Sequence, residues 1–333
     1  MGSDFYMHWK PAARGLLHQM GGLATLRLVH RGRFRVLMLH EFRESVCKNL
    51  DLICNYISCN YKPVTLSAIA AAIHSKRRLP ANALTVTVDD GYRNFLMFGH
   101  PIFKKYGIPT TVYAVAGFAD GRLWLWTDQV AFVLGQTAKR GFSVEVKKGK
   151  AVDLDLSSAT SRSHAARSLC EELKEVPNQQ RLEFLSGFAS LCKVEIPPLP
   201  PAERRALSWD EMRALAADGV EIGCHTDSHP ILSRLEDQAE LEREIRGAKE
   251  VMEARLNRRV DHFCYPNGRE VDISEAAVAC VREAGFASSV TCTFGLNTLQ
   301  ANPLRIMRLP VEAGQKVEYT AEVLIGFHLR SGP

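Results

Sequence analysis

The sequence has 333 residues, of which 46% are apolar and 24% are charged, and this composition is typical of a globular protein with enough chain to bury a sizeable core. The formal net charge is +5, and the lysines and arginines are scattered without interleaved aromatic residues, so nucleic-acid binding is not expected. No run reaches the ~18 apolar residues that a membrane-spanning helix needs.

Residues 1–33 are predicted to form an N-terminal helical extension. Its apolar residues alternate with arginines (Arg14, Arg27, Arg31, Arg33 and Arg35), and they are Leu16, Leu17, Met20, Leu23, Leu26 and Leu28. This pattern fits either a helix packed against the fold, which we favour, or a basic amphipathic helix on an anionic membrane face.

The charged residues of this segment interrupt any signal-peptide core, and the nine cysteines form no CxxC pair. Free thiols are typical of a reducing compartment. We therefore expect a cytoplasmic location. If the N-terminal segment is a basic amphipathic helix, it would make peripheral contact with the inner face of the membrane.

The first part of the chain predicts alternating strands and helices. In chain order these are a strand over 34–39, a helix over 65–76, a strand over 84–88, a helix over 92–106 and a strand over 110–115. Such strand, helix, strand units imply parallel pairing. His40 directly follows the first strand, and Asp89-Asp90-Gly91 directly follows the second.

Residues 117–205 lose this rhythm, and we interpret them as an inserted helical subdomain or lid within a domain that spans 34–330. The segment contains Trp124, Trp126, two helical patterns and a proline-rich stretch. Its tryptophans, with Tyr92, could be sugar-stacking platforms, although buried aromatic residues are the more common case.

Regular alternation returns at Ser208, which with Glu211 forms a predicted capping box. The elements that follow are a helix over 211–218, a strand over 220–223, a helix over 237–256, a strand over 260–265, a helix over 273–284 and a strand over 286–290. His225 closely follows one of these strands, and Tyr265 ends another.

Polar residues at the ends of several parallel strands predict one site, because the carboxyl ends of such strands meet at one face. Asp90, His225 and His229 offer one carboxylate oxygen and two imidazole nitrogens, the ligand set of a catalytic zinc site with an open position. Asp89 is then the candidate general base. A His-x-x-x-His spacing or an Asp-Gly turn alone is also common without a metal, so the prediction depends on their combination.

With these residues in place, the chain resembles the polysaccharide deacetylase family, whose NodB-homology fold is a distorted (β/α) barrel. Thr87-Val88-Asp89-Asp90-Gly91-Tyr92 is similar to its first motif, His225-Thr226-Asp227-Ser228-His229-Pro230 to its second, and Phe263-Cys264-Tyr265-Pro266-Asn267-Gly268 to its third. The resemblance spans residues 34 to 312, with 117–205 poorly matched.

The resemblance implies a metal-dependent carbohydrate deacetylase, a hydrolase of carbon–nitrogen bonds other than peptide bonds. It implies Asp89 as base, Asp90, His225 and His229 as ligands of a divalent metal such as Zn²⁺, and the Tyr265 N–H as an oxyanion donor. The expected partner is an N-acetylated carbohydrate, and the sequence leaves the oligomeric state open. Alternatives are hydrolysis of O-acetyl esters or small cyclic amides, or a catalytically inactive glycan-binding barrel.

The sequence departs from the family in three respects. Val88 replaces the usual Phe, which should only alter packing. No arginine precedes Tyr265 to orient the base, and Arg308 or Arg305 is the candidate replacement; we group Arg308 with Tyr265 as substrate-binding candidates. The late Leu-x-x-His motif is also absent, and His328 does not fit it. In the branch of the family that acts on surface polysaccharides, a histidine after the first strand takes the place of the histidine of this late motif. We therefore expect His40 to be the catalytic acid. Its alternative role is a structural hydrogen bond to a loop.

Overall fold

The structure is a computed structural model that describes residues 22–327. Seven parallel strands pair in the order β1-β10-β9-β8-β7-β4-β3, and β3 pairs again with β1, which closes a barrel. The strands are β1 Arg35–Leu39, β3 Ala83–Val88, β4 Thr110–Ala114, β7 Glu221–Cys224, β8 His262–Cys264, β9 Ser288–Phe294 and β10 Ile306–Pro310. The short strand β2, Lys62–Pro63, extends the sheet beside β3. The predicted distorted (β/α) barrel is confirmed.

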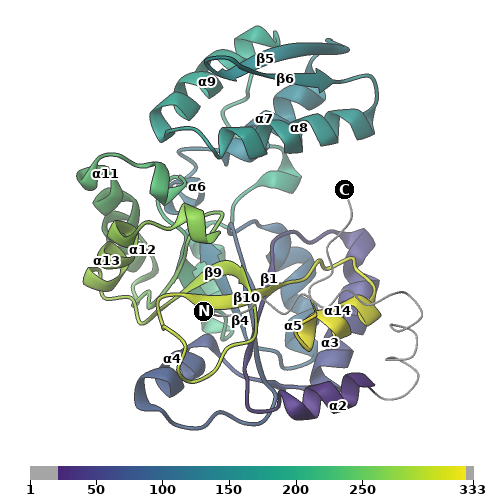
Figure 1. Cartoon of the computed structure of the whole chain (residues 1–333), viewed down its shortest axis with the longest axis vertical. Coiled ribbons are helices and arrows are strands. Elements are labelled where there is room, and N and C mark those ends of the chain that lie inside the picture. The colour runs from purple at the N-terminus through teal and green to yellow at the C-terminus, as the bar shows by residue number, and fades with distance from the viewer. Residues whose placement is uncertain (1–21, 328–333) are drawn as a thin grey trace.

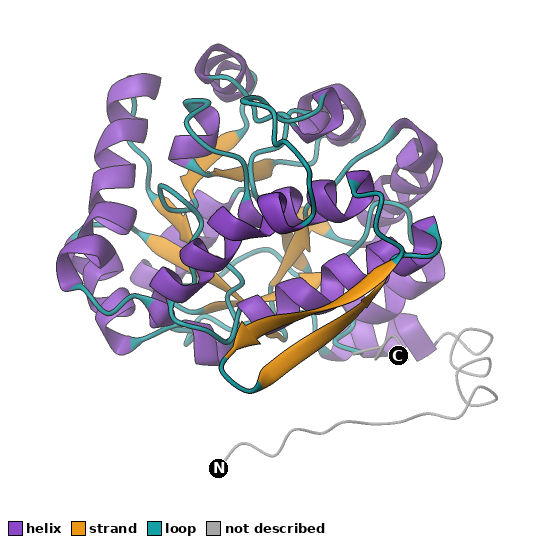
Figure 2. Cartoon of the chain, turned by 90° about the horizontal axis from the view of Figure 1, so that it is seen from above, coloured by secondary structure: helices purple, strands orange, loops and turns teal. Residues whose placement is uncertain are grey.

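Helices surround the barrel, so its strands are buried on both faces (Figure 2). All six residues of β3 are buried, as its run of apolar and β-branched residues predicts. The helices outside the insert are α2 Gly22–Val29, α3 Cys47–Asn60, α4 Leu66–Ser75, α5 His100–Lys105, α6 Ala116–Ala119, α10 Trp209–Ala217, α11 Gln238–Glu242, α12 Ala248–Leu256, α13 Glu275–Glu283 and α14 Val317–Leu324.

Side-chain caps fix where several of these helices begin. Thr65 accepts a hydrogen bond from the Ala68 N–H at the start of α4, and Ser208 and Glu211 form the predicted capping box of α10. Two predicted helices contain a π turn instead of a continuous α-helix. These turns are η2, Phe95–Gly99, before α5, and η5, Arg243–Gly247, between α11 and α12.

The segment between α6 and α10 forms a separate lobe above the barrel (Figure 1). Its elements are α7 Trp126–Gln136, β5 Gly141–Lys147, β6 Lys150–Asp155, α8 Ala159–Leu173 and α9 Asn178–Leu191. The hairpin β5–β6 is antiparallel and turns at Gly149, where φ is +79°. The lobe has its own apolar core, in which Leu134, Leu169 and Leu173 are fully buried.

The N-terminal helix α2 exposes Leu28 and Val29 to solvent, while the predicted apolar residues Leu16, Leu17 and Met20 lie outside the described residues. Arg35 is not part of a basic helix face, because it belongs to β1 and is fully buried. Its Nε donates to the Leu324 carbonyl oxygen at 2.7 Å, so it cannot contact a lipid headgroup. Within residues 22–327, no helix is long and apolar enough to cross a membrane.

Candidate functional site

The turn after β3 directs two adjacent carboxylates differently. Asp89 continues the strand and donates its N–H to the Leu39 carbonyl oxygen at 2.9 Å, whereas Asp90 and Gly91 both have φ of +72°. A Cβ on Gly91 would lie 3.0 Å from the Ala114 Cα, so no larger residue fits there. The left-handed turn therefore separates the two carboxylates along the rim of the barrel.

A second strained turn, after β7, carries the two histidines. His225 donates its N–H to the Ala114 carbonyl oxygen at 2.9 Å, and Thr226 and His229 have φ of +69° and +59°. The Thr226 Oγ1 accepts the His229 N–H at 3.0 Å and closes the turn. Residues with side chains rarely adopt this conformation, and such strain is concentrated at functional sites.

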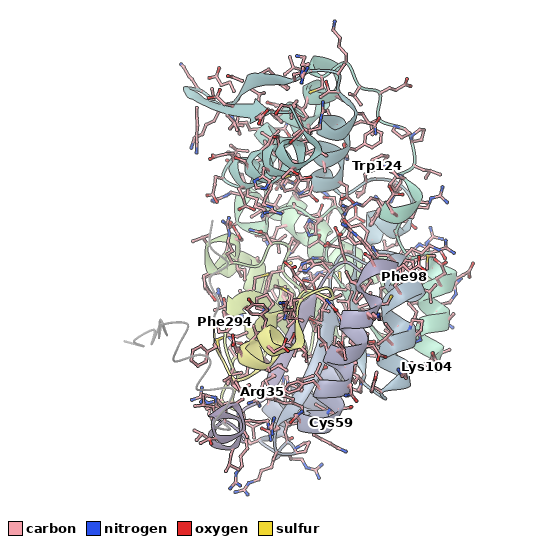
Figure 3. The ribbon with its side chains drawn as sticks, turned by 90° about the vertical axis from the view of Figure 1, so that its right-hand side faces the viewer. Arg35, Cys59, Phe98, Lys104, Trp124 and Phe294 are labelled. Atoms are coloured by element: carbon pink, nitrogen blue, oxygen red, sulfur yellow. The ribbon has the colours of Figure 1, made fainter. Side chains whose placement is uncertain are left out.

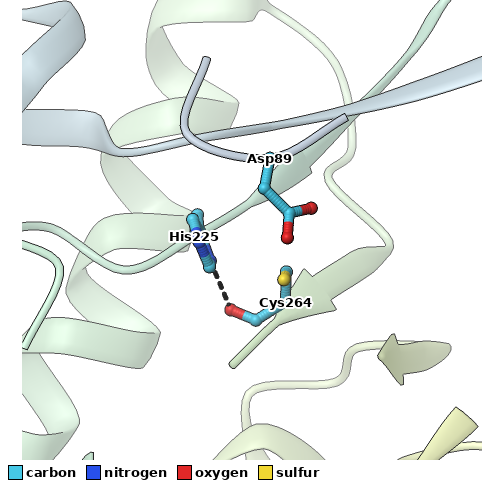
Figure 4. Close-up of side chains that lie close together, drawn as sticks. All are labelled: Asp89, His225 and Cys264. Atoms are coloured by element: carbon cyan, nitrogen blue, oxygen red, sulfur yellow. Dashed lines mark hydrogen bonds between the residues drawn. The ribbon is translucent and has the colours of Figure 1, made fainter. Parts of the chain in front are cut away.

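The three predicted ligand atoms converge. The Nε2 atoms of His225 and His229 are 3.2 Å apart, and they lie 3.6 Å and 3.5 Å from the Asp90 Oδ1. The His225 Nδ1 lies 2.7 Å from the Cys264 carbonyl oxygen (Figure 4). This contact leaves the His225 Nε2 facing Asp90. A hydrogen bond at the far ring nitrogen is the usual support of a metal-binding histidine. The donor set fits a divalent cation with nitrogen and oxygen ligands.

The protonation states also suit a metal. Burial and the charge of His225 lower the pKa of His229 to about 3, so its imidazole is neutral at neutral pH. Burial opposes the charge on Asp90, but the hydrogen bond with His225 and the electrostatic effect of the neighbouring histidines outweigh it and hold the pKa of Asp90 below its usual value. Metal ligands must be deprotonated, and both groups are.

Cys264 belongs to a second cluster of possible ligands with Asp89 and His225. Burial raises the pKa of the Cys264 thiol well above its usual value, so a neutral thiol faces the site. Its Sγ lies 3.4 Å from an Arg308 nitrogen. A thiol is a poor ligand until it loses its proton, so the Asp90 cluster is the better candidate.

Asp89 forms a buried, two-pronged ion pair with Arg308. The distances are 2.7 Å between Nη1 and Oδ1 and 2.8 Å between Nη2 and Oδ2, and the exposed fractions are 2% for Asp89 and 0% for Arg308. Burial raises the pKa of Asp89, but the charges of Arg308 and His40 and the hydrogen bonds outweigh it and lower the pKa. Asp89 is therefore ionised and held in a fixed orientation.

Arg308 is the candidate that replaces the missing orienting arginine, and Arg305 is not. Arg305 pairs with Glu270 and Glu275 at the surface, at 2.8 Å and 2.7 Å. The guanidinium of Arg308, which we grouped with the substrate-binding candidates, is enclosed by Asp89, Thr87 and Thr291 and has no exposed surface. In this structure Arg308 holds Asp89 in place and has no surface open to a substrate.

The Tyr265 side chain is also buried, and its hydroxyl donates to the Leu304 carbonyl oxygen at 3.1 Å. Its backbone N–H donates to the Val290 carbonyl oxygen at 3.3 Å. Both groups are engaged within the barrel in this conformation, and the substrate contact and the oxyanion role of Tyr265 stay predictions. The reason is local: Tyr265 continues the pairing of β8 with β9.

His40 lies at the rim on the other side of Asp89. Its Nε2 is 3.6 Å from the Asp89 Oδ2, and its side chain is 45% exposed. A histidine that is both beside the candidate base and open to solvent can reach a substrate atom. His328, the other candidate for this role, lies outside the described residues.

A family model described as polysaccharide deacetylase matches residues 76–288, nearly two thirds of the chain. The chain belongs to the polysaccharide deacetylase family. A comparison of the sequence with curated proteins found no match.

Solved structures of deacetylases share the fold. The Streptococcus pyogenes deacetylase PplD in complex with acetate has a TM-score of 0.57 at 13% identity, over 88% of this chain and 98% of that one. IcaB from Ammonifex degensii has a TM-score of 0.54 at 14% identity, over 89% and 98%. The deacetylase domain of BpsB from Bordetella bronchiseptica has a TM-score of 0.52 at 16% identity, over 84% and 96%.

Glu244 of this polysaccharide deacetylase supports the metal loop, residues 225–230, and it was not predicted from the sequence. Its Oε2 accepts the N–H groups of Asp227 and Ser228 at 3.0 Å and 2.9 Å, and its Oε1 accepts the Ser228 hydroxyl at 2.5 Å. It lies in the π turn η5, a feature common at functional sites. The sequence contains one sign of this role, because Glu244 is a charged residue on the apolar helix face between Leu241 and Ala248.

A polar network joins the inserted lobe of the polysaccharide deacetylase to the rim beside His40. The Tyr92 hydroxyl donates to Asp128 at 2.8 Å, and Arg204 bridges Asp128 at 3.2 Å and Glu41 at 2.5 Å. Burial raises the pKa of Asp128 to about 6, although the charge of Arg204 opposes the shift. Tyr92 is buried in this network, so it is not a stacking platform for a sugar.

Proposed function

We propose that the chain is a metal-dependent hydrolase that removes the acetyl group from an N-acetylated amino sugar. The observation that carries the proposal is the ionised, oriented pair Asp89–Arg308 beside the convergent ligands Asp90, His225 and His229. Zinc is the metal that this ligand set favours. The acetate bound to the similar structure of PplD agrees with acetyl chemistry.

The residues divide the proton transfers between them. A divalent metal supplies Lewis acidity, which polarises a carbonyl group and makes water more acidic. Asp89 accepts the proton of the attacking water as its oxygen bonds to the acetyl carbon. His40 gives a proton to the sugar nitrogen as the carbon–nitrogen bond breaks, and the products are acetate and the free amine.

An inactive barrel is the rival hypothesis, and it is motivated by the missing orienting arginine and the missing late histidine. The missing arginine no longer argues for an inactive barrel, because Arg308 makes the two hydrogen bonds to Asp89 that an orienting arginine would make. An acetyl ester contains the same carbonyl group, so the rival substrates must be separated by experiment.

The test is acetate release from N-acetylglucosamine oligomers and from acetylated sugar esters by the zinc-loaded protein. We expect Asp89→Asn to keep stoichiometric metal and to lose ~10²-fold or more of the rate, the scale of general base catalysis. His225→Ala should lose the metal itself. Full turnover by Asp89→Asn would contradict the role of the base, and acetate release from the sugar esters without any release from the N-acetylglucosamine oligomers would change the proposed substrate.

A further inference from the structure

The segment that leaves the inserted lobe, residues 204–207, is joined to the turn that carries Asp90. Two backbone hydrogen bonds of 2.8 Å make this joint, one from the Leu207 N–H to the Gly91 carbonyl oxygen and one from the Arg93 N–H to the Arg205 carbonyl oxygen. The backbone at Arg204 therefore has a fixed place relative to a candidate metal ligand.

The inserted lobe also holds the Arg204 side chain in place. The two ends of the lobe meet where the Trp124 Nε1 donates to the Pro198 carbonyl oxygen at 3.3 Å (Figure 3). Asp128 lies in α7 of the lobe, and its Oδ1 is 3.2 Å from the Arg204 Nη1. The Asp128 Oδ2 accepts the Tyr92 hydroxyl at 2.8 Å. Because Asp128 is buried and both of its oxygens have partners, it fixes the guanidinium from the side of the lobe.

Arg204 also binds the segment that carries His40. The Arg204 Nη1 donates to the Glu41 Oε1 at 2.5 Å, and the Arg43 Nη2 donates to the Glu41 Oε2 at 2.6 Å. Burial opposes the charge on Glu41, but the charges of the two arginines and their hydrogen bonds outweigh it and lower the pKa of Glu41. Glu41 is therefore ionised at neutral pH, and its contact with Arg204 is an ion pair.

Backbone hydrogen bonds do not fix the segment of residues 40–42. Outside the helices and strands, no backbone hydrogen bond in the described part of the chain involves any of the three residues. Phe42 anchors one side of the segment, because its ring is buried in the core. On the other side, the His40 Nε2 is 3.6 Å from the Asp89 Oδ2, which is longer than a hydrogen bond. The place of His40 at the rim therefore depends on what holds Glu41.

We propose that Arg204 is a positioning residue for the candidate acid His40. It connects the segment of His40 to the turn of Asp90, so it sets where the acid stands relative to the metal site. Arg43 cannot do this, because it lies on the same segment as Glu41. The inference rests on the proposed function for the role of His40. A displacement of about 1 Å at a reacting group can cost 10²-fold in rate, so the contact matters even if the fold is unchanged.

The test removes each side of the contact in the zinc-loaded enzyme. Glu41→Met removes the acceptor and leaves Arg204 paired with Asp128, whereas Arg204→Met removes the donor. For either variant we expect kcat for acetate release from N-acetylglucosamine oligomers to fall roughly 10-fold or more, with KM within twofold. The rate for 4-nitrophenyl acetate should stay within twofold, because its leaving group needs no proton.

Arg43→Met is the matched control, because it removes the other partner of Glu41 without freeing the segment, and it should change neither rate. In a His40→Gln background, Arg204→Met should cost less than a further twofold, because a residue that acts through His40 has no effect once His40 is absent. Independent losses in the double variant, or equal losses on the amide and the ester, would overturn the inference.

A crystal structure of the Glu41→Met variant gives a readout that does not depend on activity. We expect the His40 side chain to leave its position 3.6 Å from Asp89. An unmoved His40 would contradict the positioning role. If His40 moves in the variant but the wild-type enzyme releases no acetate from the oligomers, the positioning role holds and the proposed function fails.

Discussion

The buried pair between Asp89 and Arg308 gives the sharpest test of the proposed mechanism. Arg308→Met removes the guanidinium and keeps an unbranched apolar side chain, so it leaves a carboxylate that is 2% exposed without its two hydrogen bonds. Breaking a buried ion pair from one side costs about 3–5 kcal/mol. We therefore expect a clear fall in the free energy of unfolding at neutral pH.

The sign of the pH dependence follows from the pKa of Asp89. Arg308 holds this pKa below its usual value against the effect of burial. A lowered carboxyl pKa stabilises the fold above the unfolded pKa, and the stabilisation is lost as the pH falls through the folded pKa. The stability difference between wild type and Arg308→Met should thus be largest near neutral pH and shrink in acid.

Activity should change in the same direction. Without Arg308, burial dominates and the pKa of Asp89 rises, so the acid limb of the kcat/KM profile moves to higher pH. Each unit of that shift lowers the ionised fraction tenfold at pH values well below the pKa, so the loss of rate should increase as the pH falls.

The assay is acetate release from an N-acetylglucosamine oligomer between pH 5 and pH 9, with metal content measured on each sample. Arg305→Met is the matched control, because Arg305 pairs with exposed carboxylates, where an ion pair contributes at most about 1 kcal/mol. If Arg308→Met kept its metal and showed the wild-type pH profile, the assignment of Arg308 as the residue that orients the base would be wrong.

Two further predictions concern the acid and the metal loop. His40→Gln should lower amide hydrolysis ~10²-fold or more but affect 4-nitrophenyl acetate much less, because a nitrophenolate leaves without a proton; equal losses on both substrates would exclude His40 as the acid. Glu244→Ala should weaken zinc affinity ~10–100-fold in a competition titration with a chelator, because Glu244 holds Asp227 and Ser228 in the metal loop. Unchanged affinity in that variant would show that the loop is rigid without Glu244.

Hydrophobic periodicity was enough to predict the alternation of strands and helices, and strand ends were enough to predict Asp89, Asp90 and His225 together. These signals are local, since each needs only the residues of one element and its cap. The hairpin strand β6 and the barrel strand β10 were not predicted. β10 has the sequence Ile-Met-Arg-Leu-Pro, whose arginine interrupts an apolar run.

The arginine of β10 shows why the rest of the site could not be predicted from the sequence. In a closed barrel, side chains from strands that are not neighbours meet inside, so an orienting guanidinium can come from any inward position. Arg308 reaches Asp89 after β3, Thr291 in β9 and Cys264 in β8. The guanidinium thus lies against Cys264, directly before Tyr265, where the family pattern led us to look for an arginine. Strand β8 has Cys264 where the family pattern places an arginine, and strand β10 brings a guanidinium to the same point, so only closure of the barrel brings the two positions together.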